Sequence, residues 1–201
     1  IHQLNKKDTN ISNLIESPIS KLSRLENETI QPPTKLFSYR KNSLGIDLSE
    51  EGNIKRYSEL DSLRDVQAFS IIEGKEISSG LKVDIISPHL NFSKIGDAFF
   101  ADKKIIDEAL ESLKQYELTW KNYDYNKRIE IIQNLADLIE SNYEILVEAC
   151  VKEAGKTIND SIADIREAID FCRYYSLVAE DLFREIELPG PTGEINKYKF
   201  K

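Results

Sequence analysis

Four apolar repeats of helical spacing fill residues 101–185, and they constrain the fold more than any other feature of the chain. Apolar residues three or four positions apart line one face of an α-helix. The sequence therefore predicts four amphipathic helices, of which the last is the longest and runs to about residue 185. The four stripes are Ile105, Ile106, Ala109, Leu110 and Leu113; Ile129, Ile132, Leu135, Leu138 and Ile139; Ile145, Leu146, Ala149 and Cys150; and Ile158, Ile162, Ile165, Ile169, Cys172, Val178 and Leu182.

The string EAGKT at 153–157 is similar to the end of a phosphate-binding loop, G-x-x-x-x-G-K-[ST]. Position 150, where that loop needs its first glycine, is Cys150, and the preceding residues are helical in pattern rather than strand-like. We therefore interpret Gly155 as the residue that ends the third helix, because glycine tolerates a positive φ there. Asn126 is the predicted N-cap of the second helix.

Two strands are predicted from alternation. LKVDII at 81–86 alternates apolar and polar residues, and SPHLNFSKIG then predicts a turn into a second short strand. ELPGPTGE at 187–194 holds two prolines and two glycines, which predicts irregular structure. INKYKFK at 195–201 alternates like a strand without a visible partner. Because the chain also contains no methionine and begins with Ile1, we expect an internal piece of a longer protein.

Residues 1–80 show few sustained periodicities, and Pro32-Pro33 forbids a regular helix there. Short helices are predicted at 10–15, capped by Asn10, and at 18–25, opened by Ser17. A further helix is predicted to begin at Ser49 or Glu50 and to cover IKRYSELDSLRDVQAF. The sequence thus predicts an irregular linker with short elements.

Composition narrows the possible functions. A net charge of −8 argues against a nucleic-acid or anionic-membrane surface, since phosphate neutralisation needs clustered Lys and Arg. The longest apolar runs are too short to span a bilayer, so membrane association is not expected. The N-terminus also does not show a basic stretch followed by an apolar core, as a secretory signal would. We therefore expect a cytoplasmic protein. Cys150 and Cys172, 22 positions apart, suit reduced thiols. With His2 and His89 far apart, no metal site is predicted.

The strings CVKEAGKT, REAIDFCRYY and LPGPTGE, at the spacing found here, resemble the first helices of the aldehyde dehydrogenase module of the proline utilization A family. NSLGIDLS at 42–49 resembles the string that follows that family's proline dehydrogenase barrel. Trp120, Lys127 and Arg128 match positions where the family has W and R. The resemblance implies a bifunctional bacterial enzyme: a flavin-dependent module oxidises proline to pyrroline-5-carboxylate, and an NAD-dependent module oxidises glutamate semialdehyde to glutamate.

The resemblance also implies what lies elsewhere. The family's flavin contacts and paired arginines precede residue 1, and its nucleotide-binding sheet, catalytic cysteine and water-activating glutamate follow residue 201. We therefore predict no catalytic or cofactor-binding residue in this chain, with NAD and FAD belonging to the parent family. Cys150 and Cys172 are interpreted as small buried hydrophobes.

A substrate contact is the one site prediction. In related semialdehyde dehydrogenases an acidic residue on the last of these helices approaches the substrate's amino group, and Asp160 and Asp164 match that region. The alternative is that these acids complement the helix dipole. We predict that Lys156 and Arg173 are surface or inter-module salt-bridge partners. An aromatic packing cluster is predicted from Trp120, Tyr123 and Tyr125. His89 has no visible ligand partner.

The predicted fold is mainly α with a few short strands, an incomplete N-terminal portion of an aldehyde dehydrogenase α/β fold preceded by an irregular linker. Residues 1–80 would be the proline dehydrogenase tail and connector, partly disordered, and 81–201 the helical part of the dehydrogenase module. We predict a proline-catabolic oxidoreductase fragment that is inactive alone. The alternative is a non-catalytic helical scaffold or interaction module. Expected partners are the remaining portions of the enzyme or a second copy.

Overall fold

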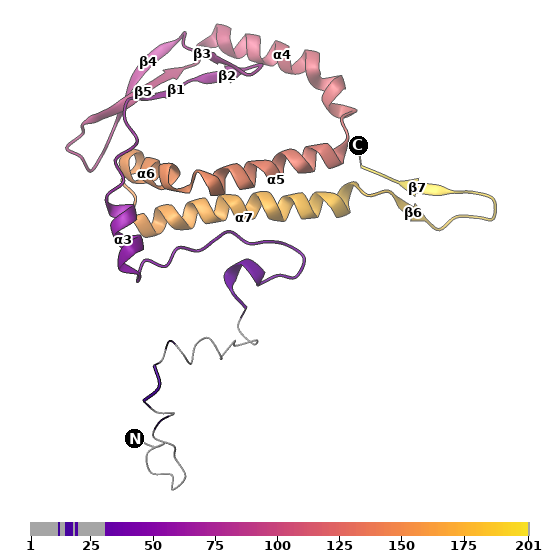
Figure 1. The fold of residues 1–201 in the computed structure, drawn as a ribbon. Helices are drawn as coiled ribbons and strands as arrows, with labels where there is room; N and C mark the ends of the chain where they lie inside the picture. The colour runs from indigo at the N-terminus through magenta and orange to yellow at the C-terminus, as the bar shows by residue number, and fades with distance from the viewer. Residues whose placement is uncertain (1–11, 13–14, 18, 20–30, 201) are drawn as a thin grey trace. The chain divides into compact units, whose positions relative to one another are not determined.

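The computed structural model describes residues 12, 15–17, 19 and 31–200, and the chain divides into two units after Pro32 (Figure 1). The predicted helices at 10–15 and 18–25, with Asn10 as a cap, fall largely outside the described residues. The second unit begins with a 3-10 turn, η1 (Pro33–Lys35), and contains every other element described below.

Four helices follow the four apolar stripes and confirm that part of the prediction. They are α4 (Lys103–Lys121), α5 (Tyr125–Ser141), α6 (Tyr143–Ala154) and α7 (Ile158–Phe183). Helices α5 and α7 lie side by side along most of their length, and α6 packs against α7 (Figure 1). Within the part of the chain that the structure describes, no helix is both long and apolar enough to cross a membrane.

The core lies where α5, α6 and α7 meet. Ala136 of α5, Val147 of α6 and Ile169 of α7 are fully buried, and a tyrosine hydroxyl in this core, that of Tyr143, donates to the Ile162 carbonyl oxygen at 3.0 Å. A shorter helix, α3 (Glu51–Ser58), adds Tyr57 to the same cluster. The predicted apolar faces of α5, α6 and α7 therefore meet each other, whereas most of the α4 stripe is exposed, with Ile106 at 50%, Leu110 at 51% and Leu113 at 66%.

The helix ends follow local chemistry. Gly155 adopts φ 67° at the end of α6, as predicted, and Thr157 caps α7 by accepting from the Asp160 N–H. The predicted cap of α5 is wrong: Asp124 is the N-cap, and its carboxylate accepts the N–H of Asn126 at 2.8 Å. The reason is that the Asp124 carboxylate, two residues earlier, already accepts that free N–H, so Asn126 lies inside the first turn.

A three-stranded sheet has the order β1-β5-β4. Its strands are β1 (Val66–Ala68), β4 (Leu81–Ile86) and β5 (Lys94–Phe100). Strands β4 and β5 confirm the two predicted strands and pair antiparallel, and β1 is parallel to β5. Glycine is required at 96, because a Cβ there would lie 2.1 Å from the Val66 carbonyl oxygen. Beside this sheet, β2 (Ser70–Ile72) and β3 (Lys75–Ile77) form an antiparallel hairpin.

The predicted helix over IKRYSELDSLRDVQAF is only partly correct. Helix α3 begins after Glu50, as predicted, but it ends at Ser58. Residues 66–68 form β1 instead, because their main-chain groups pair with the glycine-containing edge of β5. The strands β1–β3 were not predicted, since three-residue strands offer too little alternation to detect.

The C-terminal prediction also needs correction. Strand β6 (Ile186–Leu188) pairs antiparallel with β7 (Asn196–Tyr198), so residues 187–188 are not irregular and the final strand does have a partner. The prolines and glycines lie in the loop between the two strands, where Gly193 adopts φ 95°. The fold class is confirmed as mainly α with short strands. The predicted boundary at residue 80 stays a prediction.

Candidate functional site

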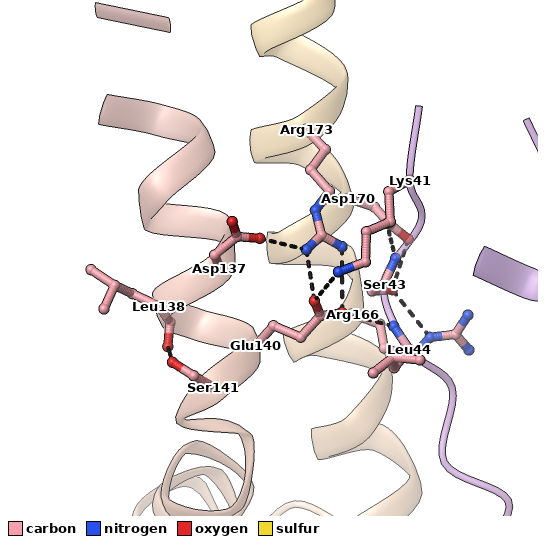
Figure 2. A network of polar contacts seen from close by, with 10 residues as sticks. All are labelled: Lys41, Ser43, Leu44, Asp137, Leu138, Glu140, Ser141, Arg166, Asp170 and Arg173. Carbon is pink, nitrogen blue, oxygen red and sulfur yellow. Dashed lines mark hydrogen bonds and ion pairs between the residues drawn. The ribbon is translucent and has the colours of Figure 1, made fainter. Parts of the chain in front are cut away.

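A highly connected carboxylate, that of Glu140, lies near the end of α5 (Figure 2). Its carboxylate accepts from the Arg173 guanidinium of α7 at 2.7 Å, from the Leu44 main-chain N–H at 2.9 Å and from the Lys41 ammonium at 3.1 Å. Arg173 also donates to Asp137 at 2.9 Å. One carboxylate thus joins two helices to the segment that precedes α3.

The environment fixes the charge of this pair. The hydrogen bond from Arg173, opposed by burial and helped by the Leu44 N–H, lowers the pKa of Glu140 from 4.5 to about 2. Burial of Arg173 disfavours its charged form, but the hydrogen bonds to Glu140 and Asp137 outweigh burial and raise the pKa of Arg173. The Arg173 side chain is only 8% exposed. Arg173 is therefore a salt-bridge partner, as predicted, but it does not lie at the surface, because it is buried against its carboxylate partners on the adjacent helix α5. The inter-module alternative stays a prediction.

Ser43 makes a second contact to the same helices. Its N–H and its hydroxyl donate to the two carboxylate oxygens of Asp170 at 2.7 and 3.0 Å (Figure 2). The Arg166 Nε atom donates to the Ser43 hydroxyl oxygen at 3.4 Å. Ser43 is fully buried, so this polar residue depends on α7 for every hydrogen bond that compensates its loss of water.

Glu148 of α6 repeats this chemistry at the other end of α3. Its carboxylate, 2% exposed, accepts from the Ser62 hydroxyl at 2.6 Å, the Ser62 N–H at 3.1 Å and the Leu63 N–H at 2.9 Å. Lys152, one turn later, forms an ion pair with it at 2.6 Å and with Asp61 at 3.0 Å. Burial raises the pKa of Glu148, but these hydrogen bonds outweigh it and leave that pKa below its usual value.

The predicted substrate residues lie on the first turns of α7. The Thr157 hydroxyl donates to the Asp160 carboxylate at 2.8 Å and accepts the Asp160 N–H at 3.1 Å. Asp164 forms an ion pair with Lys156. Both carboxylates are exposed, and each already has a partner within the chain. The substrate contact and the helix-dipole alternative both stay predictions.

The cysteines do not have the environment of a nucleophile. Burial raises the pKa of the Cys150 thiol, whereas a reactive cysteine needs a lowered one. Cys172 packs against the core cluster. The ring of His89 has the Ser87 hydroxyl 3.2 Å from its Nδ1 atom. Among residues 31–200 and the few described before them, no group of His, Cys, Asp and Glu side chains could hold a metal ion.

An apolar groove of about 350 Å³ runs between α5 and α7. Beside it, the Arg128 guanidinium lies 5.5 Å from the Trp120 ring and 5.3 Å from the Phe183 ring. Trp120 stacks on Tyr123 at 5.7 Å, whereas Tyr125 stacks on Phe183 at 6.0 Å, so the three predicted residues belong to two stacked pairs. Their packing role stays a prediction. The groove is lined by Tyr125, Arg128, Ile129, Ile132, Phe171, Cys172, Tyr175, Ser176, Ala179 and Phe183.

Sequence reasoning missed Ser43, Ser62, Glu140, Glu148 and Asp170. One signal was available: Glu148 interrupts the apolar run ILVEACV, and an acid on a buried helix face needs hydrogen-bond donors. Lys152, one turn after Glu148, could be found from spacing. The Ser62 and Leu63 donors could not, because they belong to a distant segment without regular structure.

The helices and short sheets are those of an aldehyde-oxidising class of enzyme: the aldehyde dehydrogenase family model matches residues 76–199, and the chain belongs to that family. The similarity extends further in the Bifunctional protein PutA of Escherichia coli, 30% identical over 94% of this chain and 16% of that protein. The 1-pyrroline-5-carboxylate dehydrogenase of Staphylococcus haemolyticus is 28% identical over 80% of this chain and 32% of its own length.

Solved structures show the same similarity as the sequence comparisons. Proline utilization A from Bdellovibrio bacteriovorus, inactivated by N-propargylglycine, superimposes with a TM-score of 0.74 and 27% identity, over 86% of this chain and 18% of that one. A Thermus 1-pyrroline-5-carboxylate dehydrogenase with bound NAD shares the fold, with a TM-score of 0.68 and 23% identity over 81% of this chain and 31% of that one. The predicted resemblance to proline utilization A is confirmed. The chain spans less than a third of the length of each of these four proteins.

Proposed function

We propose that this chain supplies the connector and the first helices of the dehydrogenase part of a bifunctional proline-catabolic oxidoreductase. The parent reaction is NAD-dependent oxidation of glutamate semialdehyde, coupled to flavin-dependent oxidation of proline. One observation carries the proposal: similarity to a bifunctional PutA protein covers 94% of the chain, whereas similarity to the 1-pyrroline-5-carboxylate dehydrogenase of Staphylococcus haemolyticus covers 80%. The additional part of the chain is matched by the bifunctional relative.

The polypeptide alone is inactive under this proposal. Aldehyde oxidation needs a thiolate and a hydride acceptor site. The Cys150 thiol is held protonated by burial, Cys172 belongs to the core, and the resemblance puts the family's nucleophile beyond residue 201. The proposed setting is the cytoplasm, and the proposed partner is the rest of the same enzyme.

The test is an NADH assay on the purified chain with pyrroline-5-carboxylate and NAD, with E. coli PutA as the positive control. We expect NADH from the control and none above background from the chain. NADH formation that disappears in a Cys150→Ala or Cys172→Ala variant would overturn the assignment of inactivity.

The acidic pair on α7 belongs to the same proposal. Asp164 is the better placed of the two to receive a substrate ammonium group, because its present partner is an exposed ammonium, that of Lys156, which a substrate could replace. Titration of the chain with glutamate, followed by NMR, tests this. Shifts at Asp164 and Lys156 that vanish in Asp164→Asn support the contact; unchanged spectra leave the dipole role as the explanation.

The second candidate is a non-catalytic helical scaffold, which the exposed apolar groove between α5 and α7 favours. Size-exclusion chromatography and thermal unfolding of the isolated chain separate the candidates. A compact monomer with a cooperative transition favours a self-sufficient scaffold. Aggregation or a broad transition favours a part of a larger enzyme.

A further inference from the structure

Residues 41–63, which we call the connector segment, have little regular structure apart from α3. Where such a segment packs against the protein, its main-chain N–H groups need acceptors, which helices or sheets supply in most proteins. Here the acceptors are carboxylates of α5, α6 and α7. The N–H groups of Ser43, Leu44, Ser62 and Leu63 all donate to Asp170, Glu140 or Glu148 at 2.7–3.1 Å.

The two places of attachment have the same chemistry. In each, a Ser-Leu dipeptide offers two consecutive N–H groups and one hydroxyl to helix carboxylates; we call them the Ser43 site and the Ser62 site. In each, a cation on a helix supports the carboxylate, Arg173 at the first and Lys152 at the second. A cation next to the acceptor keeps it ionised, and hydrogen bonds to ionised acceptors are about twice as strong as neutral ones.

Between the two sites, α3 is attached by packing. Tyr57 is 7% exposed and belongs to the same core cluster as the buried residues of α5, α6 and α7. Arg56 adds an ion pair to Glu144 of α6. The connector segment is therefore held at both ends by charge-assisted hydrogen bonds and in the middle by an apolar side chain.

We propose that the α5–α6–α7 surface is a docking site for the connector segment of this same chain, and that the segment is a rigid arm rather than a flexible linker. The Ser43 site and the Ser62 site act independently, because their carboxylates come from different helices. The role of this arm rests on the proposed function: the arm sets where the polypeptide from the proline-oxidising part joins the dehydrogenase helices.

The test is hydrogen exchange of the full chain, followed by NMR at single amides, so it does not depend on any enzyme activity. In the unmodified protein we expect the amides of Ser43, Leu44, Ser62 and Leu63 to exchange at least about 100-fold more slowly than in an unfolded chain. Exchange at the unfolded rate at these four amides would overturn the proposal, while leaving the proposed function untouched.

Substitutions then test the independence of the two sites. Asp170→Asn should accelerate exchange at Ser43 about tenfold or more, because a charged acceptor is replaced by a neutral one, and leave Ser62 and Leu63 unchanged. Glu148→Gln should do the reverse. The matched control is Glu130→Gln, an exposed acid of α5 that should change none of these amides.

Ser43→Ala provides a variant that leaves every helix residue intact. It should accelerate exchange at Leu44 without changing the amides of Ile165 and Ile169 in the α7 core. Equal acceleration at both sites in Asp170→Asn, Glu148→Gln and Ser43→Ala would show one cooperative unit and would contradict independent sites. NADH formation by the unmodified chain would instead overturn only the inactivity stated under the proposed function.

Discussion

Glu140 shows how one buried carboxylate can determine the stability of this protein at acidic pH. Its side chain is 12% exposed and its pKa is lowered from 4.5 to about 2, first by the hydrogen bond from Arg173. A lowered pKa means that the ionised form stabilises the fold. This contribution is fully present above pH 4.5 and is lost as the pH falls toward about 2.

The first prediction compares wild type with Glu140→Gln. At neutral pH the variant should be about 3 kcal/mol less stable, because a shift of one pKa unit is worth about 1.4 kcal/mol and Arg173 loses its charged partner. The difference should shrink as the pH falls from about 5 to about 2. Urea unfolding at several pH values measures it, and a constant difference across that range would contradict the role given to Glu140.

The second prediction concerns the glycine that ends α6. Gly155→Ala should cost about 1–3 kcal/mol, because φ is 67° and the new Cβ would lie 2.9 Å from a Pro88 side-chain carbon. Gly52→Ala is the matched control: no atom lies within 4 Å and φ is not positive, so about 0.4–1 kcal/mol of stabilisation is expected. Thermal unfolding of both variants measures the two changes in stability. Equal changes in Gly155→Ala and Gly52→Ala would contradict the role given to Gly155.

Residue-level features were predictable when their cause was local. The end of α6 at Gly155 follows from the preference of glycine for a positive φ. The cap of α5 was misplaced by two residues, since both Asp124 and Asn126 can cap a helix and only the backbone path selects one. The main-chain partners of Glu140 and Glu148 were not predictable, because Leu44, Ser62 and Leu63 are far away in sequence. Lys152 lies one turn after Glu148, so that ion pair could be predicted from spacing.

At the scale of elements, the contact between α5 and α7 forms the centre of the fold. Ala136 and Ile169 are both fully buried in the core cluster, and the small alanine lets the two helices approach closely. Arg173 bridges the same pair of helices near Glu140. Packing and charge therefore stabilise one interface together.

The third prediction tests that interface. Ile169→Ala should destabilise the protein by about 2–5 kcal/mol, because a fully buried side chain leaves a cavity between packed helices. Leu182→Ala, on the same helix but 46% exposed, should cost about 1 kcal/mol or less. Guanidinium unfolding of the two variants gives the comparison, and similar losses would contradict the assigned core.

The helices were predictable as elements because each repeats its apolar pattern over several turns. Strand β4 was predictable from the alternation of LKVDII, and β5 from the turn that follows it. The strands β1, β2, β3 and β6 were not predictable, since each has three residues and its pairing depends on a partner elsewhere. Long local patterns were therefore readable, and short non-local pairings were not.

At the scale of the whole molecule, the described chain exposes many large apolar side chains for its size. Phe171, 49% exposed, and Tyr175, 59% exposed, stack on each other at 5.9 Å along the groove between α5 and α7. Contiguous exposed apolar surface of this kind is typical of interaction sites.

The fourth prediction is that the groove binds the apolar dye anilinonaphthalenesulfonate. Dye fluorescence with wild type should fall by about half or more in Phe171→Asp, because the charge disrupts the apolar lining. Ile71→Asp, a 69% exposed position on the β2–β3 hairpin, should change little. Circular dichroism verifies that both variants are folded, and equal dye signals in wild type and Phe171→Asp would show that the groove is not the binding surface.

The parallel pairing of β1 with β5 has a practical consequence for how this protein is expressed. The aldehyde dehydrogenase match begins at residue 76, which makes that position an attractive start for a shorter expressed piece. Such a piece would lack Val66–Ala68 and would leave the β5 backbone at Gly96–Ala98 without its neighbour. An open strand edge recruits strands from other molecules, so a useful truncation begins before residue 66, not at the border that sequence similarity suggests.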